Sequence, residues 1–374
     1  MAVIVSVLLI LGEAHGDAKI RPVLTARRRP DKRVATKGAP AGAAPELTKN
    51  AHALILASMH DTSTFRPVAL LVVLACALSS CSLTRVGVYA SDAFLGEEDP
   101  AIAGAALPSF MKVSEVLLAT NPSKQGNATT VASLWLLYAT AFLDGETLFL
   151  PDDAYLKRQE LTSRARALCL RAYRLLSPFV EKKSPGFFSV DFQLLPGADA
   201  QARSATQSAL KPFKKTDADL MYYTAASILA AFSSDPLDFD HAARVPAAIA
   251  LLEGALSLAP DRADIQELAF TVYASMPADL GGSRERAVAA YESAMEASGG
   301  KSAGLFVSHA LIIRVADDDA AGFKADLERA LAISASDAPR SALMNALARR
   351  KAAYLLEHMG DYVLDYSTEG GIAP

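Results

Sequence analysis

The sequence of 374 residues predicts an all-α fold. From residue 101 onward, Ala- and Leu-rich segments carry apolar residues at three- and four-residue spacing, which is the period of an amphipathic helix. Few β-branched residues alternate as they do in strands, and Asn-Pro, Pro-Asp and Gly-Gly pairs separate the segments. We therefore expect stacked helical hairpins. The predicted helices are 101–120, 128–148, 153–180, 216–232, 243–259, 262–276, 284–298, 301–316, 319–334 and 339–365.

The second helix of three successive pairs repeats one pattern of small and apolar residues. The aligned sets are Ala248, Leu252 and Ala255; Ala287, Tyr291 and Ala294; and Phe323, Leu327 and Ala330. Their last alanines recur at intervals close to the tetratricopeptide (TPR) period of about 34 residues. This spacing predicts degenerate TPR-like repeats that form a solenoid or bundle. The alternative is a non-repetitive helical bundle with coincidental spacing.

The widest interruption of the helical pattern is segment 181–215. A connection of that length is typically functional or mobile, and we expect it to cap or wrap one face of the stack.

An apolar run from Val68 to Leu78 follows the single basic residue Arg66 and ends on Leu78-Ser-Ser-Cys81. A run of this length behind a positive charge indicates a secretory signal, since a membrane span needs about 20 apolar residues. The ending resembles the lipobox of bacterial lipoproteins. That resemblance implies that Cys81 receives a diacylglyceryl thioether and becomes the new N-terminus. The alternative is a buried core helix with a free cysteine.

Residues 1–58 show no periodicity, and a signal peptide of ordinary length would start at Met59. We expect 1–58 to be untranslated or unstructured, although a genuine basic extension is the alternative. The expected organisation is then a signal peptide at 59–80, a lipidated N-terminus and tether at 81–100, and one all-α domain at 101–374.

Charge and cysteine content narrow the function. The whole chain has a formal net charge of −4, and the part after residue 80 is more acidic because the first 80 residues are basic. This sign disfavours binding to a nucleic-acid backbone. Of three cysteines, only Cys169 falls inside the predicted domain, so no internal disulfide is expected, and we interpret it as a small core residue.

Motifs for catalysis, metals or cofactors are weak. The histidines of the domain lack the spacing of a zinc site; they are His241, His309 and His358. Residues 317–319 are three aspartates where a helix should begin, which favours N-capping over a metal cluster. Gly281-Gly282 before Ser283 lacks a nucleotide-loop context and indicates a hinge with an N-cap. We therefore expect no enzyme, no metal and no cofactor.

Aromatic residues are the candidates for an apolar ligand site. Trp135, Tyr138 and Phe142 form one stripe at helical spacing, for which ordinary core is the alternative interpretation. Tyr222 and Tyr223 are adjacent on one helix and cannot face the same side. We expect at least one of these two rings to be exposed or to border a groove.

Several stretches in order resemble the T components of tripartite ATP-independent periplasmic (TRAP) transporters, which are TPR lipoproteins. The resemblance extends from about Leu95 to Ile333. It rests on Ala132–Phe142, Arg166–Tyr173, Asp217–Ala226, Met276–Tyr291 and Leu327–Leu331.

This resemblance implies a helical fold with a ligand cleft or pore that docks a periplasmic solute-binding protein. It also implies homo-oligomers, with a trimer as one option, and apolar ligands. We expect a lipid-anchored protein on the periplasmic face of the inner or outer membrane, which binds a TRAP-type solute-binding protein and handles an apolar or organic-acid ligand. The alternatives are an envelope scaffold that binds peptides without a small ligand and, less favoured, an enzyme.

Overall fold

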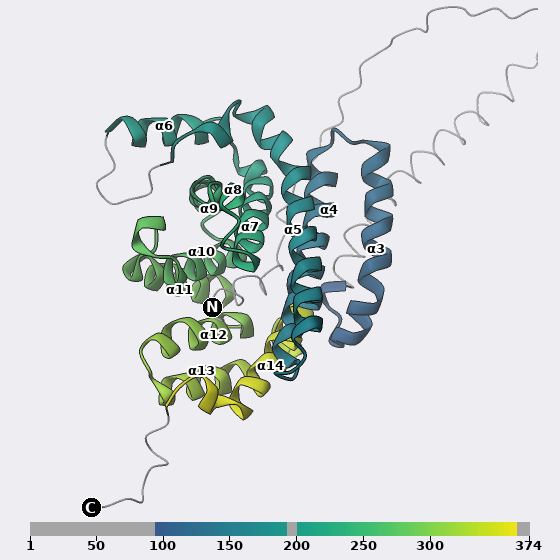
Figure 1. Cartoon of the computed structure of the whole chain (residues 1–374), viewed down its shortest axis with the longest axis vertical. Helices are drawn as coiled ribbons and strands as arrows, with labels where there is room; N and C mark the ends of the chain where they lie inside the picture. The colour runs from purple at the N-terminus through teal and green to yellow at the C-terminus, as the bar shows by residue number, and fades with distance from the viewer. Residues whose placement is uncertain (1–93, 193–199, 365–374) are drawn as a thin grey trace, which may run out of the picture. The chain divides into compact units, whose positions relative to one another are not determined.

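The computed structural model describes residues 94–192 and 200–364, and within these ranges the regular structure is helical, with no strand. The predicted all-α class is confirmed (Figure 1). The expected start at Met59, the signal peptide and the lipidated Cys81 lie outside the described residues. They stay predictions.

The α-helices are α3 (Pro100–Thr120), α4 (Gln125–Leu137), α5 (Tyr155–Lys183), α6 (Ala200–Leu210), α7 (Ala218–Ser234), α8 (Phe239–Ala242), α9 (Val245–Leu258), α10 (Ala263–Ser275), α11 (Arg284–Ser298), α12 (Ala303–His309), α13 (Ala320–Ala332) and α14 (Ala342–Glu357). Two predicted helices continue in another geometry. The one expected at 128–148 passes into the π-helix η3 (Tyr138–Asp144) and then the 3-10 helix η4 (Gly145–Phe149). The one expected at 301–316 passes into the π-helix η8 (Ala310–Arg314).

The segment 181–215 contains a helix that the sequence pattern did not predict. Helix α5 extends to Lys183, and the eleven-residue α6 occupies Ala200–Leu210. Helix α6 is rich in Ala, Ser and Gln and carries few large apolar residues. The three- and four-residue apolar spacing that predicts a helix is therefore too weak to recognise there. The interruption is therefore shorter than expected.

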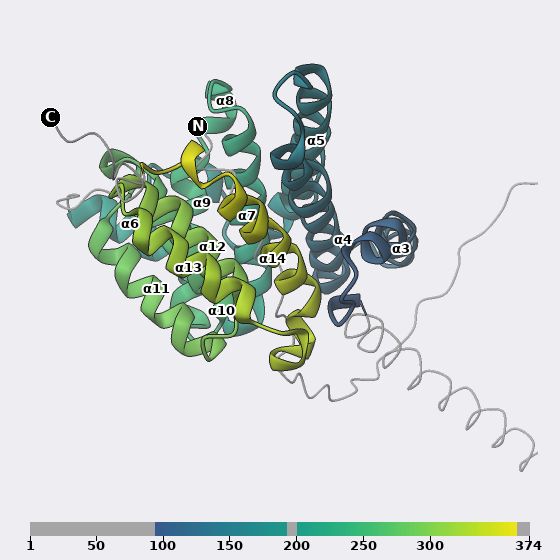
Figure 2. The ribbon, with the colours of Figure 1, turned by 90° about the horizontal axis from the view of Figure 1, so that it is seen from below.

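Successive helices pack as hairpins. The pairs in contact are α4 with α5, α7 with α9, α10 with α11, and α12 with α13. Figure 1 shows α10 beside α11 and α12 beside α13, and Figure 2 shows the same region turned by 90°. Helix α7 contacts α4, α5 and α9, so all its sides are covered and nearly all its residues are buried.

The aligned alanines serve the predicted role of small contact residues. Ala255, Ala294 and Ala330 are each 0% exposed, on α9, α11 and α13. A methyl side chain lets two helix axes approach closely, which favours tight hairpins. The assignment of these hairpins to TPR repeats stays a prediction.

Helix α14 joins the end of the domain to its beginning. It packs on α12 and α13, and it also contacts α3. Its Arg350 pairs with Glu146 of η4, while the guanidinium carbon lies 3.9 Å from the centre of the Phe149 ring. These contacts connect the C-terminal helix to the π-helical region after α4.

Two expected caps are present. Asp319 begins α13, and its Oδ1 accepts from the Gly322 N–H over 2.8 Å. Ser283 begins α11, and its Oγ accepts from the Arg286 N–H over 3.3 Å. Gly282 is required just before this cap, because a Cβ there would lie 1.7 Å from the Met276 carbonyl oxygen.

Candidate functional site

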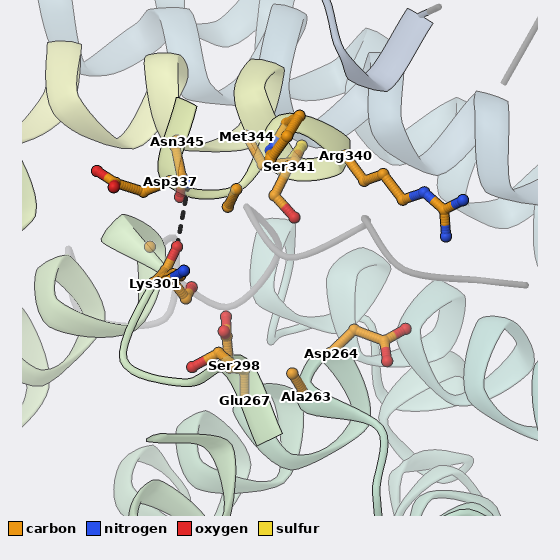
Figure 3. A pocket seen from close by; sticks show the side chains of 14 residues that line it. Ala263, Asp264, Glu267, Ser298, Lys301, Asp337, Arg340, Ser341, Met344 and Asn345 are labelled. Atoms are coloured by element: carbon orange, nitrogen blue, oxygen red, sulfur yellow. Dashed lines mark hydrogen bonds between the residues drawn. The ribbon is translucent and has the colours of Figure 1, made fainter. Parts of the chain in front are cut away.

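A cavity of about 380 Å³ opens where α10, the start of α12 and the start of α14 approach one another (Figure 3). Its lining mixes charged, polar and small residues. The lining residues are Ala263, Asp264, Glu267, Ser298, Lys301, Ser302, Gly304, Asp337, Ala338, Pro339, Arg340, Ser341, Met344 and Asn345. A volume of this order suits a small organic molecule.

Asn345 fixes one wall of the cavity. Its side chain is on α14 and is only 3% exposed. Its Oδ1 accepts from the Ala303 N–H over 2.9 Å, and its Nδ2 donates to the Lys301 carbonyl oxygen over 3.1 Å. The dashed line in Figure 3 marks the bond to Lys301. One buried amide thus holds the backbone that precedes α12 against α14.

Two carboxylates form the opposite wall. Asp264 and Glu267 lie in the first turns of α10, and each is 2% exposed. The Arg262 Nε donates to Asp264 Oδ1 over 2.8 Å, and Arg262 Nη2 binds the other oxygen. Desolvation by burial raises the pKa of Asp264 in spite of this ion pair. Arg262 therefore supplies the counter-charge that allows a carboxylate to be buried beside the cavity.

The cavity also presents basic groups. Lys301 lies in the loop before α12, and Arg340 lies just before α14. In Figure 3 the side chains of Arg340 and Asp337 lie toward opposite ends of the cavity. Asp337 is occupied by a local cap, since its Oδ2 accepts from the Ser334 N–H over 2.8 Å. The cavity therefore presents both cationic and hydrogen-bonding groups.

The expected exposure of Tyr222 or Tyr223 is wrong. Tyr222 is 1% exposed and Tyr223 is 7% exposed. The two rings contact each other edge to face, with 5.0 Å between their centres, and α7 is enclosed by α4, α5 and α9, so both rings are buried. Tyr222 lies close behind the cavity, because the Arg262 guanidinium carbon is 5.7 Å from its ring centre. Neither tyrosine lines the cavity.

Trp135, Tyr138 and Phe142 do not line the cavity and pack within the N-terminal helices. Trp135 is 6% exposed, and its indole N–H donates to Glu115 Oε1 over 3.0 Å. Tyr138 stacks on Phe142 at 6.1 Å between ring centres. These contacts are those of ordinary core. A role of the stripe in ligand binding stays a prediction.

Among the described residues, the other side chains that we considered for chemistry are buried or paired within the fold. Cys169 is 1% exposed, and burial raises the pKa of its thiol to about 12. His309 Nδ1 lies 2.7 Å from Asp326 Oδ2, between α12 and α13. Within ranges 94–192 and 200–364, no group of three or more His, Cys, Asp or Glu residues could hold a metal ion.

The chain matches the family model described as TRAP transporter T-component over residues 96–363. It is also similar to an uncharacterized protein of Treponema pallidum (strain Nichols), with 30% identity over 294 residues, which covers 77% of this chain and 85% of the relative. The chain belongs to the TRAP transporter T-component family. Membership confirms the resemblance seen in the sequence and connects the protein to TRAP transport, a membrane-associated bacterial system in which the family's role is that of a transporter component.

The cavity of this T component was missed by sequence reasoning, which looked for aromatic stripes. Its residues come from the start of α10, the α11–α12 connection and the segment that leads into α14, so they are far apart in the chain. One signal was available. Asn345 is a polar residue on the inward face of an otherwise Ala- and Leu-rich helix, and such a residue must find buried partners.

Proposed function

We propose that this protein is a periplasm-facing T component, anchored by lipid on Cys81, that binds a TRAP-type solute-binding protein and holds an organic acid. The observation that carries the ligand part of this proposal is the cavity at α10, α12 and α14. We place the organic acid there because charged and polar side chains stand among the small and apolar residues of the lining and can bind its polar groups.

The arrangement of charges narrows the ligand class. Lys301 and Arg340 provide positive charge for a carboxylate. Glu267, Asp264 and the hydroxyl of Ser341 lie among the lining groups and suit a hydroxyl or ammonium group of the ligand. The best-fitting ligand is thus a small organic acid with a second polar group, such as a hydroxy or amino acid.

A second hollow supports docking of a protein partner. This cavity of about 400 Å³ lies between the start of α5 and the end of α7, and Arg158, Arg166 and Asp235 are among its lining residues. Four large apolar side chains on the same two stretches of chain are 64% to 78% exposed: Tyr155, Leu156, Leu237 and Phe239. Exposed apolar groups beside arginines are typical of protein interfaces.

The test compares bound small molecules in matched variants. We expect the protein purified from its native envelope to carry an organic acid that mass spectrometry detects. The double variant Lys301→Gln/Arg340→Gln should lose that molecule and keep the solute-binding protein. Lys324→Gln, at an exposed position on α13 where the lysine pairs with Glu328, is the control and should keep both.

The scaffold alternative is favoured by the same exposed apolar side chains, since a peptide-binding scaffold would need them too. It requires that the cavity carry no small molecule. Retention of the organic acid by the Lys301→Gln/Arg340→Gln variant would contradict the proposed site, and absence of any small molecule from the wild-type protein would favour the scaffold. Homo-oligomerisation stays a prediction.

A further inference from the structure

The outer face of α3 carries an apolar stripe along its length. Ile102, Val113, Val116 and Leu117 are 57%, 55%, 65% and 54% exposed. Their spacing puts these four and the exposed Ala105 and Ala106 on one side of the helix, where the polar Ser109 separates Ala106 from Val113. We call these six residues the α3 stripe. An exposed patch of this kind marks a binding surface.

The other side of α3 accounts for its packing. Ala103, Leu107 and Met111 are at most 6% exposed and belong to the main hydrophobic core, and α3 contacts α4. The stripe is therefore not needed to hold the helix in place. Within ranges 94–192 and 200–364, nothing covers these four large side chains by more than about half.

Charged groups near the stripe are directed elsewhere. The stripe itself contains no Asp, Glu, Lys or Arg. Lys112 pairs with Glu115 over 2.8 Å, and Glu115 also accepts the indole N–H of Trp135. Three acidic residues, Glu97, Glu98 and Asp99, immediately precede α3. The stripe itself therefore offers apolar contacts, and the acidic residues before α3 disfavour an anionic surface.

We propose that the α3 stripe lies on the lipid bilayer and orients the domain against the membrane. This inference rests on the proposed anchor at Cys81. Only residues 82–93 separate that cysteine from the first described residue, and twelve residues span at most about 45 Å. A short tether gives the stripe a high effective concentration at the bilayer, so a weak apolar affinity is sufficient.

The composition of the stripe defines the kind of membrane contact. Interfacial helices usually combine an apolar face with Lys and Arg that bind anionic lipids. Here the apolar side chains act alone, and the acidic residues before α3 oppose an anionic surface. Binding should therefore occur on zwitterionic phosphatidylcholine and should not weaken at high salt, whereas charge-driven binding would be screened.

The experiment uses a chain that starts at Ser82, which retains every described residue and hence the whole described core. A hexahistidine tag ahead of Ser82 binds it to nickel-chelating lipid in phosphatidylcholine vesicles and replaces the lipid on Cys81. Cys169 is then the only native cysteine, and it is buried. Val116→Cys consequently gives one accessible thiol for an environment-sensitive fluorophore. Val288→Cys on α11, where the valine is 47% exposed, is the matched control.

On vesicles, the label at position 116 should shift to shorter emission wavelengths and be quenched by nitroxide lipids, at both low and high salt. The label at position 288 should keep the emission of a water-exposed probe. Aqueous emission at 116 on vesicles would overturn the proposal. So would a shift at 116 without vesicles in protein that sediments as an oligomer, because the stripe would then be covered by a second copy.

Failure of the anchor is separable from failure of this inference. The mass of the native N-terminal peptide reports whether Cys81 carries lipid, while the tag supplies the tether in the vesicle experiment. An unmodified Cys81 would contradict the proposed anchor and leave the vesicle result as the measure of the stripe itself.

Discussion

The Asn345 side chain and the Lys301 backbone are joined across the cavity wall by a hydrogen bond of 3.1 Å, in which Nδ2 donates to the carbonyl oxygen. The same amide accepts from the Ala303 N–H over 2.9 Å. Two hydrogen bonds from one buried side chain therefore set the position of the segment that carries Lys301 into the cavity.

Replacement Asn345→Ala should lower the free energy of unfolding by about 2–3 kcal/mol, because it leaves a buried N–H and a carbonyl oxygen without their partners. Urea denaturation measures this change. Arg349→Ala, at an exposed position of the same helix, is the control and should stay within about 0.5 kcal/mol of wild type. Equal stability of the two variants would contradict the role given to Asn345.

The Asp326 carboxylate connects α13 to the π-helical end of α12. Its Oδ2 accepts from Arg314 Nε over 3.0 Å and lies 2.7 Å from His309 Nδ1. Burial would raise the pKa of Asp326, but the hydrogen bonds from His309 and Arg314 outweigh it and lower the pKa. Because the folded state then binds the proton more weakly than the unfolded state, this stabilisation is present above about pH 4 and is lost as the pH falls through the lowered pKa.

Asp326→Asn should cost about 3 kcal/mol in the free energy of unfolding at pH 7, because it leaves two basic groups without their buried carboxylate. The loss should shrink in acid, since Asp326 of the wild type is then protonated as well. Thermal unfolding from pH 3 to 7 measures both effects. A cost that stays the same at every pH would argue against the ion pair.

Lys351 is a buried lysine of α14 that lies near Asp144 of η3. Burial lowers its pKa to about 8, against the charge of Asp144, which raises it. At this lysine, between about pH 8 and 10, the unfolded state therefore binds more protons than the folded state, which raises the free energy of unfolding with pH by at most about 3 kcal/mol. The buried Cys169 thiol has the opposite effect in this range, so the measurement uses a Cys169→Ala background. Denaturant unfolding measures this slope.

Lys351→Met should remove that rise between pH 8 and 10, whereas the exposed control Lys324→Met should keep it. Tyrosines have the opposite effect at higher pH, because burial raises the pKa of Tyr223 and the unfolded state then loses its proton first. The comparison therefore stops at pH 10. A slope that survives in Lys351→Met would show that another group causes it.

Cys169 should not react with thiol reagents in the native protein, because the thiol is 1% exposed and its pKa is about 12. In a chain that starts at Ser82, Ellman's reagent should detect no thiol before denaturation and one thiol after it. Rapid reaction under native conditions would mean that α5 opens, and the single-label design for α3 would then need Cys169→Ala.

The helical pairs were predictable because their apolar period and turn residues are local signals. Ala255, Ala294 and Ala330 were located by spacing alone, and all three are fully buried. The π-helical turns were not predictable, since Tyr138–Asp144 and Ala310–Arg314 carry the apolar pattern of an ordinary helix. Helix α6 was not predicted, because it has few large apolar side chains to form a recognisable pattern.

The candidate site was less accessible to sequence reasoning. At least one of Tyr222 and Tyr223 was expected to be exposed or to border a groove because they are adjacent on one helix. Their exposure depends instead on the neighbours α4, α5 and α9, which the local pattern does not reveal. Lys301, Arg340 and Asn345 meet only in the folded protein. Family membership, by contrast, was predictable from ordered short stretches that span most of the chain.

The measurement closest to the central claim is co-purification of Cys81–Pro374 from its native envelope, followed by mass spectrometry of the bound proteins. The account predicts a TRAP-type solute-binding protein among them, and a Leu156→Asp/Phe239→Asp variant should lose it while keeping its fold by circular dichroism. Recovery of wild-type protein without any solute-binding protein, together with subunits of an envelope assembly machine, would contradict the account.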